Sequence, residues 1–579
     1  MTPAMTQQTP ARRSVPWRIL APIVIVAAGV IAYANTLTVP FIFDDLAAIV
    51  DNPSIRKLWP PQEALIAPPR NTFAGRPIVN LSFAINYALF GPDDVRGYHA
   101  TNIFIHICTA IVLFTVLRRT FRTPRLRERF GRDADGLALA ATLLWEVHPL
   151  LSEVVTYTST RTEGLMALFL LLTLYFAIRA FESERRSRSW QIAAVCACAI
   201  GMGCKEVMAA APLLVYLYDA LLVSDSLLAP ARRRPMFYLA LAATWVSVPV
   251  MLFAFVNLTA KSGMGFQRTT PWVYALTQSS VIVHYLRLAL WPNRLTIDYF
   301  DWPLAHSIAD VWPQLLFMLA LVGVTIWGIA RRKPAALLAA WVLIILAPTS
   351  SIVPLGSEIA AERRMYLPLI ALVTCGVVLA HRLLAQRRGV VASIVVGVVA
   401  VALLAMTIRR NADYATSVTI WTDAATKRPH NQRSLSELAR VLQLAGRSRE
   451  ARPVAERVVD IDPNYPQARA LLGALLIGEG HLDAAEQHLR AAVQLDPQHA
   501  LTRTNLGLAL ARQGKTDNAI AEYRAALRVD ENFVDAHIYL ADALAAQGDA
   551  AQALTHLKTA LRLQPDAPDI RRRYELLRK

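Results

Sequence analysis

Two adjacent carboxylates, Asp44 and Asp45, stand in the first polar stretch of the chain, within P-F-I-F-D-D-L-A-A-I-V-D-N-P. The stretch directly follows an apolar segment, so the pair is predicted to lie just beyond a membrane surface. A carboxylate placed there can act as a general base that deprotonates an acceptor hydroxyl. It can also cap a helix over 46–50. Both interpretations stay open, because one aspartate can cap while the other acts.

Cationic side chains recur in the other short polar stretches between apolar segments. A guanidinium fork matches the oxygens of a phosphate, so these residues are candidates for binding a phosphate-bearing lipid. Simpler interpretations exist: Arg76 contacting lipid headgroups, and Lys205 pairing with Glu206 within its own turn. The candidate phosphate-binding residues are Arg76, Arg161, Lys205 and Arg363.

His99, Asn102 and His106 recur on one face of a predicted helix. No carboxylate or thiolate stands at ligand spacing beside the two histidines, which favours buried contacts in a helix bundle over a zinc site. The five cysteines fall inside apolar segments and predict no disulfide framework and no metal site. Ionisable groups close to a bilayer are functional candidates by default. The supporting residues are His99, His148, Glu153, Glu206 and Glu362.

The elements that must position these residues are apolar blocks long enough to cross a membrane. Hydrophobic residues make up 55% of the 579-residue chain, and they concentrate before Arg409. The net charge of +17 comes from arginine runs between the blocks, where membrane topology places them, so we exclude nucleic-acid binding. The predicted blocks are 17–39, 98–117, 136–151, 162–179, 190–204, 206–223, 236–257, 272–290, 311–330, 335–354, 365–381 and 389–408.

Basic runs in cytoplasmic loops set the predicted topology. Three blocks lie between Arg234 and Arg331, although two cytoplasmic runs must be joined by an even number of crossings. Block 272–290 contains Arg287, and a charge within a span costs about 2.5–3.5 kcal/mol. We therefore predict this block as an interfacial or re-entrant helix. The chain then has eleven spans, an uncleaved first span, a cytoplasmic N-terminus, and an outer face that carries the Asp44 loop and the C-terminal part.

The C-terminal part repeats itself every 34 residues, as Gly446, Gly480, Gly514 and Gly548 show. Alanines at 451, 485, 519 and 553 and leucines at 438, 472, 506 and 540 keep the same period. This pattern is typical of tetratricopeptide repeats, in which helical hairpins stack into a superhelix with a concave groove. The predicted domains are a membrane domain over 1–410, a linker over 411–430, and a repeat domain of about four units over 431–579. We expect a protein acceptor or partner in the groove.

The motifs, in their order along the chain, resemble the transmembrane-and-tetratricopeptide-repeat protein O-mannosyltransferase family and its bacterial relatives. The resemblance rests on F-D-D-x-x-A-I-x-D-N-P, R-P-I-V-N-L-S-F-A-I-N-Y-A-L-F-G-P, G-Y-H-A-T-N-I-F-I-H, H-P-L-L-S-E-V-V, K-E and E-R-R-M-Y-L-P, followed by the repeats. It implies an all-α membrane glycosyltransferase of the architecture called GT-C. In such enzymes an acidic motif in the first outer loop is the catalytic centre, which Asp44 and Asp45 match. Gly203-Cys204-Lys205-Glu206 departs mildly from the family's serine-lysine-glutamate.

The resemblance implies an inverting transfer of a sugar, of which mannose is one candidate, from a polyprenyl-phosphate carrier to a hydroxyl acceptor. The alanine- and arginine-rich composition suggests a multi-pass protein of a bacterial inner membrane. Fixed cations can neutralise a lipid monophosphate, so no cofactor is required, although a divalent metal stays an alternative. Two other functions stay open: a non-enzymatic scaffold that anchors the repeats, and a polysaccharide ligase or polymerase. Eleven spans exceed what an anchor needs, and a ligase predicts a large soluble loop between late spans that the sequence lacks.

Overall fold

The computed structural model describes every residue except 1–16, 69–70, 248–268, 351–357, 385–388 and 579. The predicted cytoplasmic N-terminus and the ends of predicted blocks 236–257 and 335–354 therefore lie outside the described residues. The described chain is helical without strands, which confirms the predicted fold class. It forms two compact units, Met1–Ser417 and Val418–Lys579.

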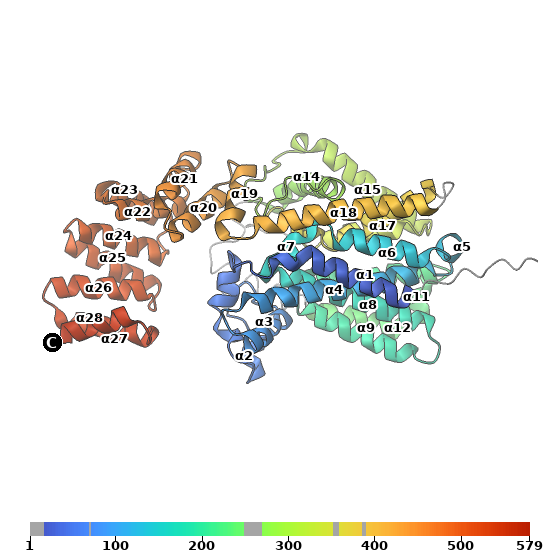
Figure 1. Cartoon of the computed structure of the whole chain (residues 1–579), viewed down its shortest axis with the longest axis horizontal. Coiled ribbons are helices and arrows are strands. Elements are labelled where there is room, and N and C mark those ends of the chain that lie inside the picture. Colours follow the sequence, from blue (N-terminus) through green and yellow to red (C-terminus); the bar gives the residue numbers. More distant parts are fainter. Residues whose placement is uncertain (1–16, 69–70, 248–268, 351–357, 385–388, 579) are drawn as a thin grey trace, which may run out of the picture. The chain divides into compact units, whose positions relative to one another are not determined.

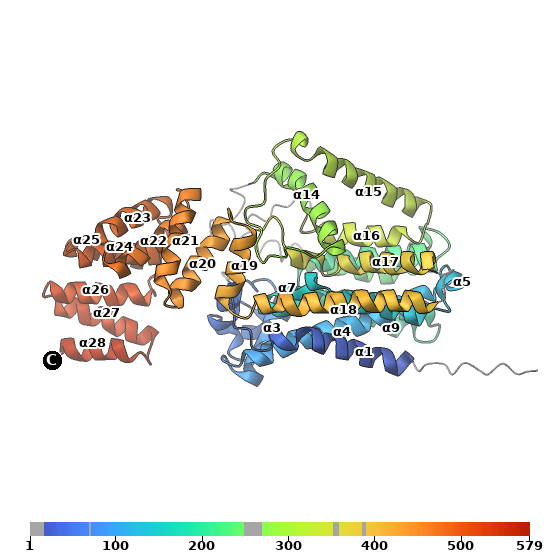
Figure 2. The same ribbon diagram turned by 45° about the horizontal axis from the view of Figure 1, so that its top comes forward.

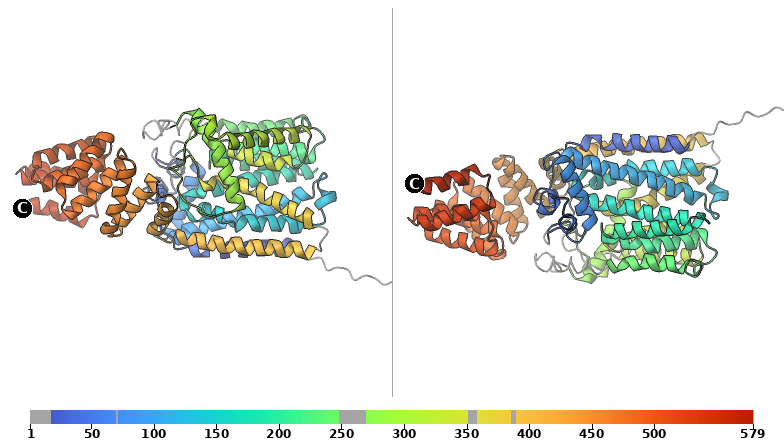
Figure 3. Two further views of the ribbon diagram at one scale, coloured as in Figure 1. Left: turned by 90° about the horizontal axis from the view of Figure 1, so that it is seen from above. Right: turned by 90° about the horizontal axis from the view of Figure 1, so that it is seen from below.

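The first unit is a bundle of apolar helices that run side by side (Figures 1 and 3). Its long axis is followed by α1 (Trp17–Tyr33), α4 (Val95–Phe121), α6 (Ala134–Glu146), α8 (Arg161–Glu182), α9 (Ser187–Met202), α10 (Ala210–Tyr218), α12 (Pro235–Ala243), α15 (Trp312–Ala330), α16 (Ala336–Leu346), α17 (Pro368–Leu384) and α18 (Gly389–Asp413). Among the described residues, six helices are long and apolar enough to cross a membrane, or seven if α6 and the bent continuation over Pro149–Thr156 form one span. The count of eleven also needs the shorter helices and stays a prediction.

Short helices cover the two ends of the bundle. They are α2 (Pro61–Leu65), α3 (Pro77–Phe90), α5 (Arg127–Phe130), α7 (Ser152–Thr156) and α11 (Ala229–Arg233). The apolar helix α3 was missed by the sequence analysis, which treated 77–90 as part of a loop. It begins at Pro77, which sets a helical φ without losing a hydrogen bond. Two buried asparagines attach it to the preceding loop, because Asn52 donates to Asn80 Oδ1 at 3.1 Å.

The basic loops gather at one end of the bundle, here called the basic end. Arg125 Nη1 donates to the Arg332 carbonyl oxygen at 3.1 Å, and Arg332 donates to backbone oxygens of Ser224 and Asp225. Arg382 lies 5.6 Å from the centre of the Phe130 ring. Loops from four parts of the chain therefore meet there, which agrees with the alternation of basic and turn-rich loops that the topology assumed.

The opposite end, here called the Asp44 end, holds the turn-rich loops and the end of the last bundle helix. Asn411 in α18 donates to the Ala32 carbonyl oxygen at 2.8 Å and to Asn35 Oδ1 at 3.2 Å. The last long helix therefore finishes beside the start of the Asp44 loop. Figure 2 shows α14 (Pro271–Leu290) lying crosswise to the bundle helices, as expected for an interfacial helix rather than a span.

The second unit stacks helical hairpins, visible in Figure 1, and confirms the predicted tetratricopeptide repeats. The hairpins are α20–α21 (Gln432–Leu444, Ser448–Ile461), α22–α23 (Pro466–Glu479, Leu482–Leu495), α24–α25 (Ala500–Arg512, Thr516–Val529) and α26–α27 (Val534–Ala546, Ala550–Leu563), followed by α28 (Pro568–Arg578). The four turn glycines have φ between 74° and 86°, a left-handed conformation that disfavours other residues. The predicted linker 411–430 is mostly helical, because α18 extends to Asp413 and α19 covers Ser417–Lys427.

Arg503, in the first helix of the third repeat hairpin, makes a structural contact within its own repeat. Its Nε donates to the carbonyl oxygen of Pro497, six residues earlier, at 2.9 Å. Equivalent contacts occur at 34-residue spacing from Arg469 to Pro463 and from Arg571 to Pro565. At the third position His537 replaces arginine and contacts the Glu531 carbonyl oxygen at 3.0 Å. These contacts tie each first helix to the turn before it.

Candidate functional site

Asp44 and Asp45 occupy different environments although they are neighbours. Asp45 is 1% exposed, and its carboxylate accepts hydrogen bonds from the Ile42 amide at 3.1 Å and the Ser159 amide at 2.6 Å. Asp44 is only partly buried, and its backbone amide donates to the Tyr157 hydroxyl at 2.9 Å. Asp45 thus fixes the loop to the segment before α8, while Asp44 remains partly exposed.

The simple capping interpretation is wrong for Asp45. A short helical turn does cover Leu46–Val50, but the Asp45 side chain makes no capping hydrogen bond to it. The carboxylate bonds instead to Ile42, whose carbonyl oxygen accepts from the Asp45 amide at 2.9 Å. This closed turn holds Phe43 at φ 46°, a conformation rare for a bulky residue. Burial raises the pKa of Asp45 to about 7, against the opposing effect of its two amide donors.

Lys205 is paired, though not with its neighbour. Its ammonium group binds the buried carboxylate of Glu163, in the first turn of α8, and Glu206 pairs instead with Arg76 Nη2 at 3.5 Å. The self-paired turn suggested by the sequence is therefore wrong. The turn lies against α3, since the Ile78 amide donates to the Gly203 carbonyl oxygen at 3.2 Å. A Cβ at Gly203 would approach Ile78 Cγ1 to 2.8 Å, so the close contact requires glycine.

Arg363 is held by two carboxylates from different parts of the chain. Its Nη1 donates to Glu153 Oε1 at 2.6 Å and its backbone amide to Glu153 Oε2 at 2.9 Å, while Nη2 binds Glu358. Arg364 donates to the carbonyl oxygens of Glu358 and Ile359 instead. Both arginines thereby have fixed positions at the Asp44 end.

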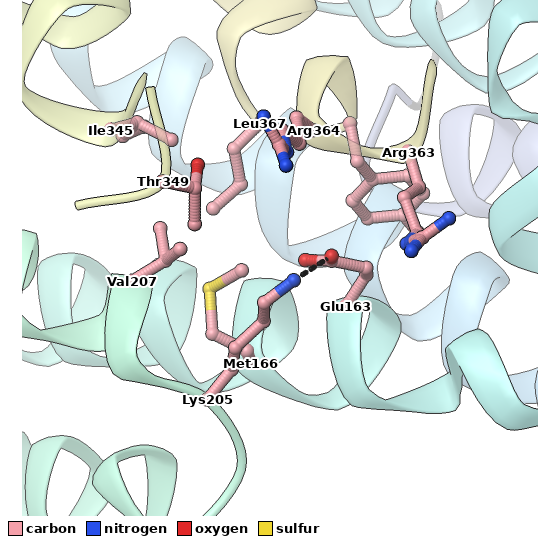
Figure 4. A pocket seen from close by; sticks show the side chains of 10 residues that line it. Glu163, Met166, Lys205, Val207, Ile345, Thr349, Arg363, Arg364 and Leu367 are labelled. Atoms are coloured by element: carbon pink, nitrogen blue, oxygen red, sulfur yellow. Dashed lines mark hydrogen bonds and ion pairs between the residues drawn. The ribbon is translucent and has the colours of Figure 1, made fainter. Parts of the chain in front are cut away.

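Lys205, Arg363 and Arg364 line one small cavity, shown in Figure 4. The cavity is narrow and partly open to solvent, and its polar wall also includes Glu163 and Thr349. Figure 4 shows the Glu163 carboxylate between Lys205 and Arg363. The remaining wall is apolar: Met166, Val207, Ile345, Tyr366 and Leu367. A cavity with clustered cations and an apolar side suits an anionic group attached to a hydrocarbon.

Glu362 bonds to the 296–299 segment and thereby anchors the loop that carries Arg363 and Arg364. Its Oε1 accepts from the Thr296 amide and from the Tyr299 hydroxyl, each at 2.6 Å. Burial raises the pKa of this carboxyl to about 7. The crosswise helix α14 holds the same loop, because the Ala361 amide donates to the Tyr285 hydroxyl at 2.7 Å.

Arg161 lies on the other side of the first turn of α8 and is almost fully buried. Its Nε donates to Asn102 Oδ1 at 2.6 Å, its Nη2 donates to the Tyr98 carbonyl oxygen at 3.1 Å, and the guanidinium lies 3.9 Å from the Phe83 ring centre. These contacts join α3, α4 and α8. Phosphate binding by Arg161 stays a prediction, and its described contacts are structural.

The three histidines make buried contacts, as predicted for His99 and His106. His99 contacts the Val39 carbonyl oxygen at 2.8 Å, and His106 contacts the Glu146 carbonyl oxygen at 3.0 Å and the Tyr366 hydroxyl at 2.7 Å. His148 contacts the Ala289 carbonyl oxygen in α14 at 3.2 Å. Within the described residues, no three His, Cys, Asp or Glu side chains are grouped closely enough to hold a metal ion.

The structure thus brings Lys205 and Arg363 to one cavity and places Arg76 beside the same turn, whereas Arg161 faces a separate set of contacts. Sequence reasoning missed Glu163, which partners Lys205, and Tyr157, which contacts the Asp44 amide. The signal for Glu163 was its place in R-T-E at the start of an otherwise apolar block. Tyr157 gave no comparable signal.

Comparison with known proteins supports the motif-based resemblance. Residues 75–253 match the family model described as dolichyl-phosphate-mannose-protein mannosyltransferase. Residues 436–500 and 504–568 match a tetratricopeptide-repeat model. A solved tetratricopeptide-repeat protein of Thermus thermophilus is 25% identical, covers 29% of this chain and 90% of its own, and has a TM-score of 0.26.

Curated relatives carry the name protein O-mannosyl-transferase. One from Caenorhabditis elegans is 23% identical over 77% of this chain and 63% of its own length. Human TMTC4 is 29% identical over 32% of this chain and 27% of its own, and Drosophila melanogaster Tmtc2 is 27% identical over 52% and 33%. The chain thus spans less than two thirds of each of these relatives. Family model, relatives and repeats agree with the order of motifs, and the chain is similar to the transmembrane-and-tetratricopeptide-repeat protein O-mannosyltransferase family.

Proposed function

We propose that the protein is a membrane glycosyltransferase that moves a sugar, with mannose as the first candidate, from a polyprenyl-phosphate carrier to a protein hydroxyl. The reaction takes place at the Asp44 end, which we assign to the outer face of a bacterial inner membrane. The tetratricopeptide repeats present the acceptor. The names of the relatives and the matching family model support the sugar and the acceptor class.

One observation carries this proposal: the segment Tyr157–Glu163 contacts both the acidic loop and the cationic cavity. Its Tyr157 hydroxyl accepts from the Asp44 amide, and its Ser159 amide donates to Asp45. At its other end Glu163 pairs with Lys205 and lines the cavity. A base and a phosphate site joined by one short, rigid segment can keep a fixed separation during a displacement.

In the proposed step the Asp44 carboxylate takes the proton of the acceptor hydroxyl while its oxygen attacks the anomeric carbon. A new carbon–oxygen bond forms as the bond between that carbon and the phosphate oxygen breaks. The electron pair leaves with the polyprenyl phosphate, whose added negative charge is stabilised by Lys205, Arg363 and Arg364. The attack comes from the face opposite the phosphate, so the anomeric configuration inverts.

The test is sugar transfer by the purified full chain in lipid nanodiscs, with mannosyl polyprenyl phosphate as donor and serine- and threonine-containing peptides as acceptors. Arg363→Ala should abolish or strongly reduce transfer, because a charge-assisted hydrogen bond contributes about 1.5–3 kcal/mol. Arg125→Ala, at the basic end, is the matched control and should transfer at the wild-type rate. Equal transfer by both variants would contradict the phosphate site, and no transfer from any polyprenyl-linked sugar would favour the scaffold.

A further inference from the structure

A group of buried polar atoms lies between α1 and α6, apart from the cavity described above. Glu146 and Tyr33 are each 0% exposed, as is Thr142 one turn before Glu146. Both Glu146 carboxyl oxygens, the Tyr33 hydroxyl and the Thr142 hydroxyl have no hydrogen-bond partner within the described part of the chain. Four such atoms on two helices that pack against each other are unusual, since buried polar side-chain atoms in folded proteins are generally bonded.

The geometry brings these atoms to one helix contact. Thr142 and Glu146 are four residues apart, and so are Gly29 and Tyr33, so each pair shares a helix face. A Cβ at Gly29 would lie 2.7 Å from Glu146 Oε1, which places the carboxyl directly against α1. Tyr33, through its ring, and Glu146, through its carbonyl oxygen, both contact His106. The faces of α1 and α6 that carry these polar atoms therefore pack against each other.

An ionised carboxylate without a partner is far more costly in an apolar interior than a neutral acid. A neutral carboxyl still needs one acceptor for its proton and one donor for its carbonyl oxygen. Water can supply both, and it can also bond to the two hydroxyls, which gives it the two to four polar partners that a buried water requires. We propose that Glu146, Tyr33 and Thr142 form a buried hydration site in which Glu146 is a neutral acid bonded to bound water.

This site backs the wall of the candidate active site. The Tyr33 ring meets the edge of His106 with ring centres 5.2 Å apart. The Glu146 carbonyl oxygen accepts from His106 Nε2, so the other ring nitrogen accepts from the Tyr366 hydroxyl. Tyr366 lines the cationic cavity. The hydration site thus lies behind a buried chain of contacts that ends at the cavity wall, and it does not depend on the proposed transfer reaction.

Radiolytic footprinting of the full chain in nanodiscs tests for the water, because hydroxyl radicals formed from a bound water oxidise the side chain beside it. Tyr33 should be oxidised several-fold faster than Tyr274. Tyr274 is equally buried, but its hydroxyl donates to the Thr349 carbonyl oxygen at 2.8 Å and needs no water. Oxidation of Tyr33 at or below the rate of Tyr274 would overturn the hydration site.

Infrared difference spectroscopy tests the proton on Glu146. At a pH of about 8 the wild type should show a protonated-acid carbonyl band that Glu146→Gln lacks. Asp45 and Glu362, whose carboxyl pKa values are about 7, are mostly ionised at this pH. If Glu146→Gln instead lacks a carboxylate band whose frequency in the wild type changes with sodium or potassium, Glu146 is ionised and binds a cation. That result would refute the proposal. The footprinting needs no variant, so poor folding of Glu146→Gln leaves the proposal testable.

Discussion

Glu153 binds Arg363 twice, through the guanidinium and through the backbone amide, although 210 residues separate them in the chain. The contact is largely buried, because the Glu153 side chain is 1% exposed and the Arg363 side chain is 16% exposed. Because the carboxylate bonds to the amide as well, it fixes the position of the loop and not only the direction of the side chain. Arg363 therefore reaches the cavity from a rigid base.

Glu153→Gln should destabilise the protein and weaken donor binding. Glutamine keeps the size but loses the charge, and one charge-assisted hydrogen bond contributes about 1.5–3 kcal/mol. The free energy of unfolding in detergent and the donor KM measure the two effects. The matched control is Glu182→Gln, which removes a pair with Arg119 that is 43% exposed on the acidic side and should change stability by about 1 kcal/mol or less. Equal losses in both variants would show that the Glu153 contact has no special role.

Asp44→Asn should reduce sugar transfer by about 10²–10⁴ while leaving the protein inserted and its repeats folded. Asparagine keeps the shape but cannot take the acceptor proton. Asp45→Asn should act mainly on stability. The two carboxylate oxygens of Asp45 each accept one hydrogen bond, from the Ile42 amide and from the Ser159 amide, whereas an asparagine side chain has only one acceptor oxygen. Transfer rates and melting temperatures of both purified variants separate the roles. A larger loss of transfer in Asp45→Asn, at wild-type stability, would exchange them.

Stability should fall as pH rises from about 4 to about 7. Burial raises the pKa of Asp45 and of Glu362 to about 7, above their ordinary values, so the folded state binds more protons than the unfolded state in this window. This contribution to the free energy of unfolding is fully present below a pH of about 4 and is lost above a pH of about 7. A tenfold difference in proton affinity between the folded and unfolded states corresponds to about 1.4 kcal/mol. Thermal unfolding across this range measures it. Glu362→Gln should flatten the curve, and an unchanged curve would contradict the assignment.

Cysteines introduced near Asp51 and near Gly514 should both react with a membrane-impermeant thiol reagent that is added on the non-cytoplasmic side of the membrane. This follows from the eleven-span topology, which places the Asp44 loop and the repeats on one face. The native cysteines must be replaced first, because Cys196 and Cys375 are exposed on apolar helices. Labelling at only one of the two sites would contradict the topology.

The fold could be predicted largely because two periodicities are strong. Apolar blocks and arginine runs fixed most of the bundle helices, and the 34-residue spacing of Gly446 and its equivalents fixed the repeats. Helix α3 was missed because its polar residues, Asn80 and Asn86, interrupt the apolar pattern, although both are buried in the bundle. Only tertiary contacts satisfy such side chains, and periodicity does not show them.

The candidate site was predicted by residue type but not by partner. Lys205 was expected to pair with the adjacent Glu206, whereas its partner Glu163 comes from another helix. Likewise, capping of the 46–50 turn by one of the two aspartates was one open interpretation, and the Asp45 carboxylate instead bonds to Ser159. Sequence proximity favours local pairs, but loops from five parts of the chain meet at the Asp44 end, and pairs between them are set by the fold.

The cationic cavity is already close to electrical balance before any donor arrives. Lys205 forms a salt bridge with Glu163, and Arg363 forms salt bridges with Glu153 and Glu358. Arg364 donates hydrogen bonds to carbonyl oxygens. A free phosphate entering the cavity must compete with these groups, so its headgroup alone supplies little net attraction. For the proposed lipid donor, the hydrocarbon chain against the apolar wall should then supply most of the binding, while the cations act on the charge that develops as the phosphate leaves. The proposed site should therefore discriminate a lipid-linked phosphate from free inorganic phosphate.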